Sequence, residues 1–184
     1  MGVTLAHDPG RGPAGDATGD RIHPHPRRGD RPARRYPPGV SRITVSTTID
    51  APPERVWAAV EDVGSHVDWM QDAVAIRFTS RRQSGVGTTF DCDTRVGPFG
   101  LTDKMEITKW RPGRAMGVRH VGLITGSGVF TLRRTRAGTT RFVWKERLVF
   151  PWWMGGPFGA VIGGEVLRLI WRKNLRNLKR LVES

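Results

Sequence analysis

The chain has 184 residues, of which 38% are hydrophobic and 26% are charged, and this size and composition fit one ordinary domain rather than a multidomain protein. A single cysteine, Cys92, excludes an intramolecular disulfide and a zinc site built from several cysteines, so a reducing, cytoplasmic setting is expected. The formal net charge of +13 is spread along the chain, and no known nucleic-acid-binding motif accompanies it. Specific nucleic-acid binding is therefore not expected.

Residues 1–40 are rich in Gly, Pro, Arg and Asp and carry hardly any branched aliphatic side chains. Such a segment cannot bury enough apolar surface to offset the entropy lost on ordering, so we expect a disordered tail. It contains no apolar stretch long enough for a secretory signal. His23 and His25 supply two metal-binding side chains without a third, and we expect neither a metal site nor a cofactor in this protein.

Residues 41–184 carry the patterns of a folded domain, beginning with a strand. In residues 41–50, Ile43, Val45 and Ile49 alternate with polar side chains, which predicts a half-buried strand. Six further strand-like runs follow, at residues 73–80, 88–96, 99–109, 114–121, 123–135 and 139–149. Most of the turns between these runs are short and rich in glycine or proline, and such short connections require antiparallel hairpins. The pattern predicts a seven-stranded antiparallel sheet.

Helices are predicted on both sides of these six runs. Residues 51–63 form a short amphipathic helix with Asp50 available as its N-cap, and Gly64 ends it. Residues 65–70 predict a second short helix or turn. From Pro157 to the C-terminus, apolar side chains recur at steps of three, four and seven, which predicts one long amphipathic helix with a basic outer face. The uncharged stretch before it is too short and too rich in proline and glycine for a membrane span.

This order of elements, together with particular local sequences, resembles a known family. The segment IDAPPERVWAAVEDVGSHVDWM, the later GVGTTF and TRFVWKE, and the basic terminal helix are similar to the START-like helix-grip superfamily, also called SRPBCC. That superfamily includes polyketide cyclase-like proteins and the birch-pollen-allergen type. The resemblance covers about residues 41–183, and its most specific elements are Ala51-Pro52, Val56-Trp57 and Trp69.

The resemblance implies an α+β helix-grip fold, in which a curved seven-stranded sheet wraps around the long C-terminal helix and two short helices follow the first strand. It also implies a ligand-binding domain over residues 41–184, with an apolar cavity between sheet and helix. Members of the family hold lipids, polyketides, sterol-like or quinone-like molecules there, and they act as carriers, cyclases, chaperone modulators or sensors. The fold therefore leaves the function open.

Strand parity predicts which side chains face this interior, because alternate residues of a strand point to opposite faces of the sheet. The predicted ligand-binding residues are Trp69, Phe90, Met105, Met116, His120, Phe130, Trp144, Glu146, Leu167 and Trp171. Taken singly, the apolar members are equally typical of a packed core. Gly126 and Gly128 lie on the same face, where they leave gaps that hold a ligand or let the strand bend.

Apart from Asp103, His120 and Glu146 are the only ionisable residues on these inward faces. Burying an unpaired carboxylate costs several kcal/mol, so an inward Glu146 requires a partner or a ligand group. Three alternatives follow: Glu146 orients a polar ligand head, acts as a general base with His120 as the acid, or lies solvated at the rim beside an arginine. Cys92 shares the face of Phe90 and is predicted to be a small core residue.

Trp152 and Trp153 lie in the loop before the terminal helix. They predict a gate over the cavity, a contact with an anionic membrane helped by the basic helix, or a simple hydrophobic plug. Three functions stay open. The first is a monomeric or weakly dimeric protein that binds or carries a small lipid, polyketide or aromatic molecule. The second is a cyclase, dehydratase or hydrolase that uses the same cavity, and the third is a peripheral membrane or partner-binding module.

Overall fold

The computed structural model describes residues 39–151, 153 and 156–184, and for residues 156–162 it describes the backbone alone. The tail predicted for residues 1–40 falls outside the described residues up to residue 38. The described elements in chain order are β1 (Val40–Ile49), α1 (Pro53–Ala58), the 3₁₀ helix η1 (Val63–Asp68), β2 (Ala73–Phe78), β3 (Thr89–Val96), β4 (Phe99–Arg111), β5 (Ala115–Val121), β6 (Thr125–Arg134), β7 (Thr140–Val149) and α2 (Gly156–Glu183). They confirm the predicted helix-grip fold, and each predicted strand end agrees within two residues.

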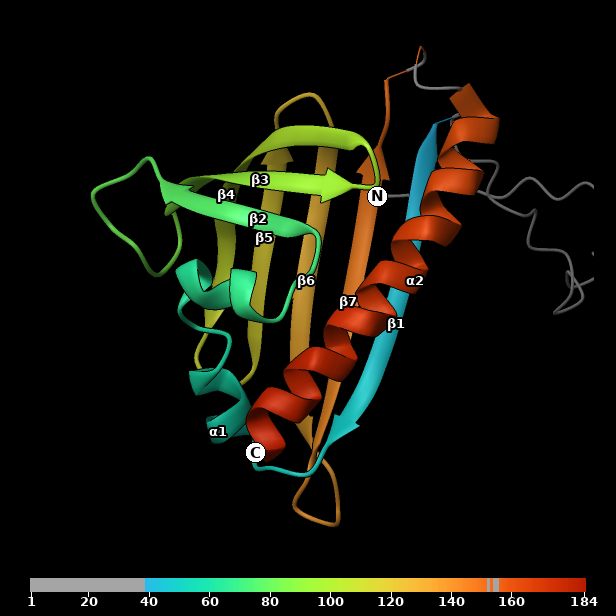
Figure 1. Ribbon diagram of the computed structural model, residues 1–184. Coiled ribbons are helices and arrows are strands. Elements are labelled where there is room, and N and C mark those ends of the chain that lie inside the picture. The colour runs from blue at the N-terminus through green and yellow to red at the C-terminus, as the bar shows by residue number, and fades with distance from the viewer. Residues whose placement is uncertain (1–38, 152, 154–155) are drawn as a thin grey trace, which may run out of the picture. The chain divides into compact units, whose positions relative to one another are not determined.

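The seven strands form one sheet in the order β1-β7-β6-β5-β4-β3-β2, and every neighbouring pair is antiparallel. The first strand therefore lies beside the last, with Val45 opposite Trp144. Figure 1 shows β2, β3 and β4 running across the direction of the other four strands, so that the sheet curves around one face. The pairing of β4 with β5 shifts register between Ile107 and Lys109, and such a bulge bends a strand and increases its twist.

The short helices differ in detail from the prediction. The N-cap of α1 is Pro52, which makes no side-chain capping bond, so the prediction that Asp50 caps this helix is wrong. The helix also ends at Ala58, earlier than expected. Gly64 does not end α1 but lies inside η1, because the Asp62 side chain accepts a hydrogen bond from the Gly64 amide at 2.9 Å and starts a new 3₁₀ turn there.

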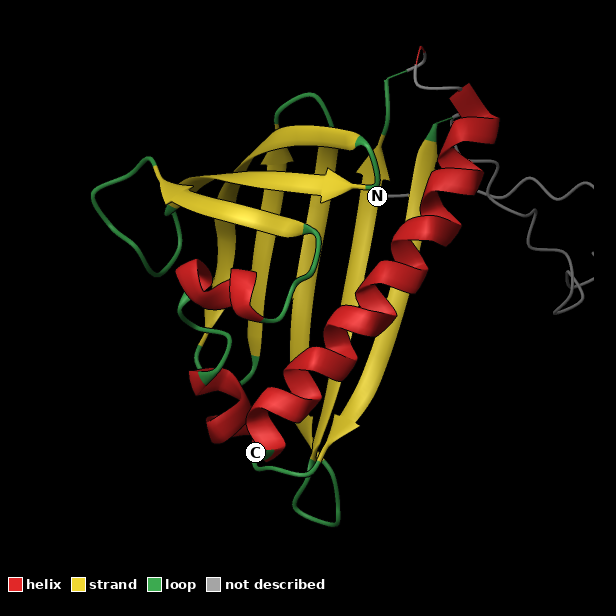
Figure 2. Cartoon of the chain, in the orientation of Figure 1, coloured by secondary structure: helices red, strands yellow, loops and turns green. Residues whose placement is uncertain are grey.

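The helix α2 lies across the concave face over β1 and β7 (Figures 1 and 2). In its second half, Leu175, Leu178 and Val182 are buried in the hydrophobic core. One turn before them, the Trp171 ring stacks on Trp144 of β7, with centroids 4.7 Å apart and planes 23° apart. Burial of this apolar stripe is the main source of stability for the helix, since a helix of this composition gains little from intrinsic propensity alone.

Two asparagines of α2 fix the loop between η1 and β2. Asn174 is fully buried, donates to Asp72 Oδ1 at 2.6 Å and accepts from the Gln71 amide at 3.0 Å. Asn177 Nδ2 donates to the Trp69 carbonyl at 3.1 Å. These side chains satisfy the polar groups of the loop, so the loop closes against the helix without a desolvation cost.

We expect Asn174→Ala to lower the free energy of unfolding by about 2–3 kcal/mol, because it leaves the buried Asp72 carboxyl group without this donor and also removes the partly buried bond from the Gln71 amide. Urea denaturation measures this as a lower midpoint at an unchanged slope. The control is Asn177→Ala, which removes one partly buried bond to Trp69 and one exposed bond from Arg180, and is expected to cost about 1 kcal/mol or less. Equal losses of unfolding free energy in the two variants would contradict the larger role given to the buried Asn174.

Candidate ligand-binding site

A cavity of about 140 Å³ lies between the concave face of the sheet, η1 and the first half of α2. Nine of the ten predicted residues line it: Phe90, Met105, Met116, His120, Phe130, Trp144, Glu146, Leu167 and Trp171. The tenth, Trp69, is buried and packs against Phe130 and Trp144, but it does not line the cavity. An apolar cavity of about 150 Å³ holds one benzene molecule, so this interior has room for one ring.

Other lining residues were not selected from the sequence. Asp103 shares its face of β4 with Met105, and the antiparallel pairing of β4 with β5 brings it diagonally beside His120. Strand parity already places Asp103 on the inward face, and this pairing is the signal that could have joined it to His120 as a site residue. His66 lies in η1 and Asp72 lies in the following loop. No strand parity applies to those two positions, so no sequence pattern pointed to them.

Asp103, His120 and Glu146 form what we call the polar cluster, and each is less than a tenth exposed. His120 Nδ1 contacts Asp103 Oδ2, and His120 Nε2 lies 3.4 Å from Glu146 Oε2. Glu146 Oε1 accepts a hydrogen bond of 2.8 Å from the Trp144 indole nitrogen. Glu146 is therefore buried with a histidine and a tryptophan as partners, and the alternative of a solvated rim position beside an arginine is wrong.

Glu146 reaches His120 because residue 128 is a glycine. Strand β6 lies between β7, which carries Glu146, and β5, which carries His120. A Cβ at Gly128 would lie 2.0 Å from Glu146 Oε1, so the carboxylate occupies the space that a side chain would take. Gly126 has a different role, because its φ is +148° and a Cβ there would meet the Arg147 carbonyl at 2.0 Å. Neither glycine leaves an empty gap.

The polar cluster changes the protonation of His120. Burial by itself lowers the pKa of the imidazole, but the hydrogen bonds and negative charges of Asp103 and Glu146 outweigh burial and raise the pKa to about 9. The ring is therefore an imidazolium at neutral pH. Three buried atoms of the cluster have no hydrogen-bond partner among the described residues: Asp103 Oδ1, His120 Nε2 and Glu146 Oε2. Unsatisfied buried polar atoms beside a cavity are suited to a ligand or to water.

His66 is the second buried histidine of the cavity wall, and its surroundings lower the pKa of the imidazole instead of raising it. Burial lowers its pKa to about 4, against the smaller opposing effects of a hydrogen bond to the Val60 carbonyl and the charge of Asp62. His66 Nε2 lies 2.8 Å from that carbonyl oxygen, so the neutral ring donates to it. The ring also packs against Trp69, with centroids 5.0 Å apart. His66 is thus a neutral wall residue.

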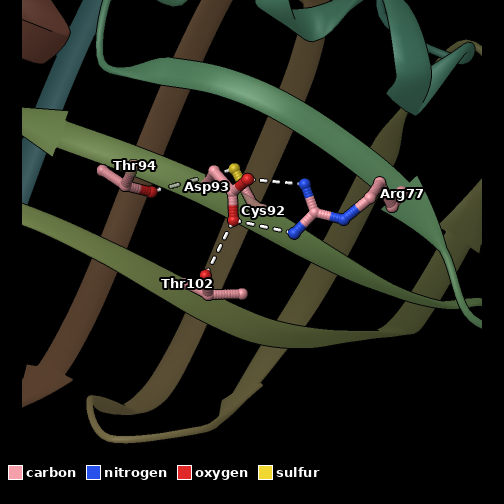
Figure 3. Close-up of polar contacts among 5 residues, drawn as sticks. All are labelled: Arg77, Cys92, Asp93, Thr94 and Thr102. Carbon is pink, nitrogen blue, oxygen red and sulfur yellow. Dashed lines mark hydrogen bonds and ion pairs between the residues drawn. The ribbon is translucent and has the colours of Figure 1, made fainter.

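Strand β3 shows how the two faces of the sheet differ (Figure 3). On the outer face, Asp93 accepts two bonds from the Arg77 guanidinium, at 2.5 and 2.8 Å, and one from Thr102 at 2.7 Å. On the inner face, Cys92 and Thr94 line the cavity, and burial raises the pKa of the Cys92 thiol to about 11. The predicted role of Cys92 as a small buried residue fits this position, because such a thiol is unreactive at neutral pH.

The charge of the cavity wall is opposite to that of the whole chain. The protein carries a formal net charge of +13, yet no lysine or arginine is found among the described residues that line the cavity. The ionisable lining side chains, apart from the Cys92 thiol, are Asp72, Asp103, Glu146, His66 and His120. Within the described part of the chain, no three such side chains are arranged to hold a metal ion.

The predicted gate falls partly outside the described residues, since Trp152 is not among them. Trp153 is exposed, with 59% of its surface accessible. No helix among the described residues is long and apolar enough to cross a membrane. The contact with a membrane or a protein partner stays a prediction.

Comparisons with known proteins agree on the fold. The sequence model of the family described as polyketide cyclase/dehydrase and lipid transport matches residues 41–183. Among solved structures, a protein of Thermus thermophilus is 16% identical, with a TM-score of 0.66 over 77% of this chain and 96% of that one. The Zhui aromatase/cyclase from a Streptomyces species is 17% identical, with a TM-score of 0.61 over 78% and 94%. The search of curated proteins finds no match. At these identities the solved structures establish the fold alone.

We expect Gly128→Ala to expel the Glu146 carboxylate from its position over β6, because the new Cβ would lie 2.0 Å from Oε1. Without that charge nearby, the pKa of His120 should fall from about 9 by roughly one unit or more, which NMR titration of the imidazole measures. Gly100→Ala in β4 is the control, because the nearest atom to its Cβ is 4.0 Å away. An unchanged His120 titration in Gly128→Ala would refute this role of the glycine.

The two buried histidines predict opposite effects of pH on stability. The pKa of His120 is raised to about 9, so its stabilisation is complete below pH 6.5 and is lost as the pH rises through 9. The pKa of His66 is lowered to about 4, so protonation favours the unfolded chain as the pH falls from 6.5 towards 4. Each change corresponds to about 3 kcal/mol, since one pKa unit is about 1.4 kcal/mol.

Urea denaturation at a series of pH values between 4 and 10 measures both effects. In His66→Gln, where no imidazole titrates at this position, the loss on the acidic side should shrink while the loss on the alkaline side stays. A variant that keeps the full acidic loss would show that other groups cause it.

Proposed function

Because the chain belongs to the polyketide cyclase/dehydrase and lipid transport family, we propose that it binds or carries a small hydrophobic molecule in the cavity between the sheet and α2. The observation that carries this proposal is the hollow interior itself. Protein cores are close-packed, and voids larger than a water molecule are few in each domain. A hollow of about 140 Å³, walled by aromatic and methionine side chains, is suited to an apolar guest.

The size of the cavity limits that guest. Since about 150 Å³ holds one benzene, the cavity as it stands fits a single ring with a short substituent. A sterol or a multi-ring polyketide would require wall side chains to move. Met70, Met105 and Met116 are three flexible wall residues that can repack around a larger molecule.

A second candidate is an acid–base enzyme that uses the same cavity, and the polar cluster favours it. A dehydration or an aldol-type cyclisation needs one group that removes a proton from carbon and one that donates a proton to oxygen. The Glu146 carboxylate supplies a base, and the His120 imidazolium, 3.4 Å from it, supplies an acid. Such a reaction needs no nucleophilic side chain.

Organic extraction of the freshly purified protein, followed by mass spectrometry, tests the proposal. A carrier should release one small hydrophobic species in near-stoichiometric amount. Returning that species to protein stripped of ligand separates a carrier from an enzyme, because a dehydratase removes the mass of one water and a cyclase, which leaves the mass unchanged, alters the chromatographic retention of the compound, whereas a carrier changes neither.

A substitution that fills the cavity provides a test with a defined probe. Val118 of β5 lines the cavity, and we expect Val118→Phe to reduce the affinity for toluene by more than about tenfold, since the larger side chain takes up volume that the ring of toluene would occupy. Ligand-observed NMR measures the affinity. Val143→Phe is the matched control, because Val143 lies on the opposite face of β7 from Trp144 and Glu146. If toluene binds wild type and both variants equally, or binds none of them, the proposed site is wrong.

A further inference from the structure

We infer that the cavity selects small apolar molecules that carry a hydrogen-bond donor, namely a hydroxyl or a protonated amine, and that it rejects carboxylates. The inference rests on the proposed function, because it names the class of ligand that this same cavity takes. It depends on the unpaired atoms of the polar cluster and on the charge of the cavity wall.

The unpaired atoms determine which ligand group fits. Asp103 Oδ1 and Glu146 Oε2 are buried carboxylate oxygens without a hydrogen-bond partner among the described residues. A carboxylate oxygen accepts hydrogen bonds, so each of the two is suited to a donor from a ligand. The third unpaired atom, His120 Nε2, already faces Glu146 Oε2 at 3.4 Å. A hydroxyl can donate to a carboxylate and accept from the imidazolium, and an ammonium can donate to either carboxylate.

The acidic side chains of the wall disfavour ligands that carry a carboxylate. The polar cluster contains two carboxyl groups and one imidazole, and Asp72 adds a further carboxyl group to the wall, so acidic side chains outnumber cationic ones there. The described lining residues provide no lysine or arginine to receive an anion. A ligand carboxylate would place its oxygens against these acceptors, and a buried charge without a partner is strongly unfavourable.

The apolar walls hold the body of such a ligand. Phe130, Trp144 and Trp171 form a continuous aromatic surface, with centroid distances of 5.0 Å between the first two and 4.7 Å between the last two. Trp144 also donates to Glu146 Oε1, so the aromatic surface leads directly to the polar cluster. A ring that packs on this surface can direct its substituent towards the polar cluster. Aromatic faces favour cationic groups as well, which suits an ammonium head.

Four monosubstituted benzenes of similar size test the inference: toluene, benzyl alcohol, benzylamine and benzoate. Their affinities for the full-length protein are measured by isothermal titration calorimetry or ligand-observed NMR at pH 7. We expect benzyl alcohol or benzylamine to bind at least about tenfold more tightly than toluene, because a bound donor satisfies oxygens that toluene leaves unpaired. Benzoate should bind most weakly of the four. The relative affinities of the alcohol and the amine distinguish a hydroxyl ligand from a cationic one.

Two conservative variants assign the effect to the polar cluster. In Glu146→Gln and in Asp103→Asn, the preference for a donor over toluene should fall to less than about threefold, and benzoate should gain affinity. Toluene binding in each variant reports that the cavity is still formed. The two substitutions are made separately, so that if one variant does not fold, the other still provides the test.

The outcomes separate this inference from the proposed function. If toluene binds but the donors show no advantage, or if benzoate binds as tightly as the alcohol, the inference is overturned while the apolar site stands. If none of the four compounds binds, both are overturned. A preference for donors that survives unchanged in both variants also overturns the inference, because it would arise elsewhere in the cavity.

Discussion

The polar cluster in the interior of this domain can form only because Gly128 has no side chain. Two strands in a sheet that are separated by a third lie about 9–10 Å apart, which is too far for most side chains to meet across the strand between them. Glu146 meets His120 because its carboxylate lies flat over Gly128, where any Cβ would be 2.0 Å from Oε1. The glycine at this position therefore lets side chains from three strands, β4, β5 and β7, form one polar cluster.

Trp144 connects that cluster to the packing of the helix. Its ring stacks on Trp171 of α2 while its indole nitrogen donates to Glu146 Oε1 at 2.8 Å. The same side chain therefore takes part in the contact that docks α2 on the sheet and in the hydrogen bond that orients the carboxylate. Side-chain networks of this kind are coupled, so substitutions of Trp144 and Glu146 should not have additive effects on stability.

Much of this arrangement was readable from the sequence, and the limits have physical causes. Period-two patterning identified the strands and the inward face, and it therefore placed Met105, His120 and Trp144 around the interior, since parity within a strand is a local property. What it missed are relations between strands. The crossing of Glu146 over Gly128 depends on the order of three strands, which no single strand encodes. Trp69 was expected in the cavity wall, but its position after η1 is set by packing against other aromatic rings rather than by periodicity.

The contrast between the surface and the interior follows from the same physics. The chain has 30 lysine and arginine residues against 17 acidic ones. On the surface this excess of positive charge is tolerated because water hydrates each cation. Inside, a charge persists only with partners, and the histidine between two carboxylates meets that condition for itself but leaves one oxygen of each carboxylate without a hydrogen bond among the described residues. The cluster therefore keeps His120 protonated and at the same time remains short of donors. That remaining demand for hydrogen bonds is a chemical property of the cavity which neither the fold nor the overall charge of the protein would suggest.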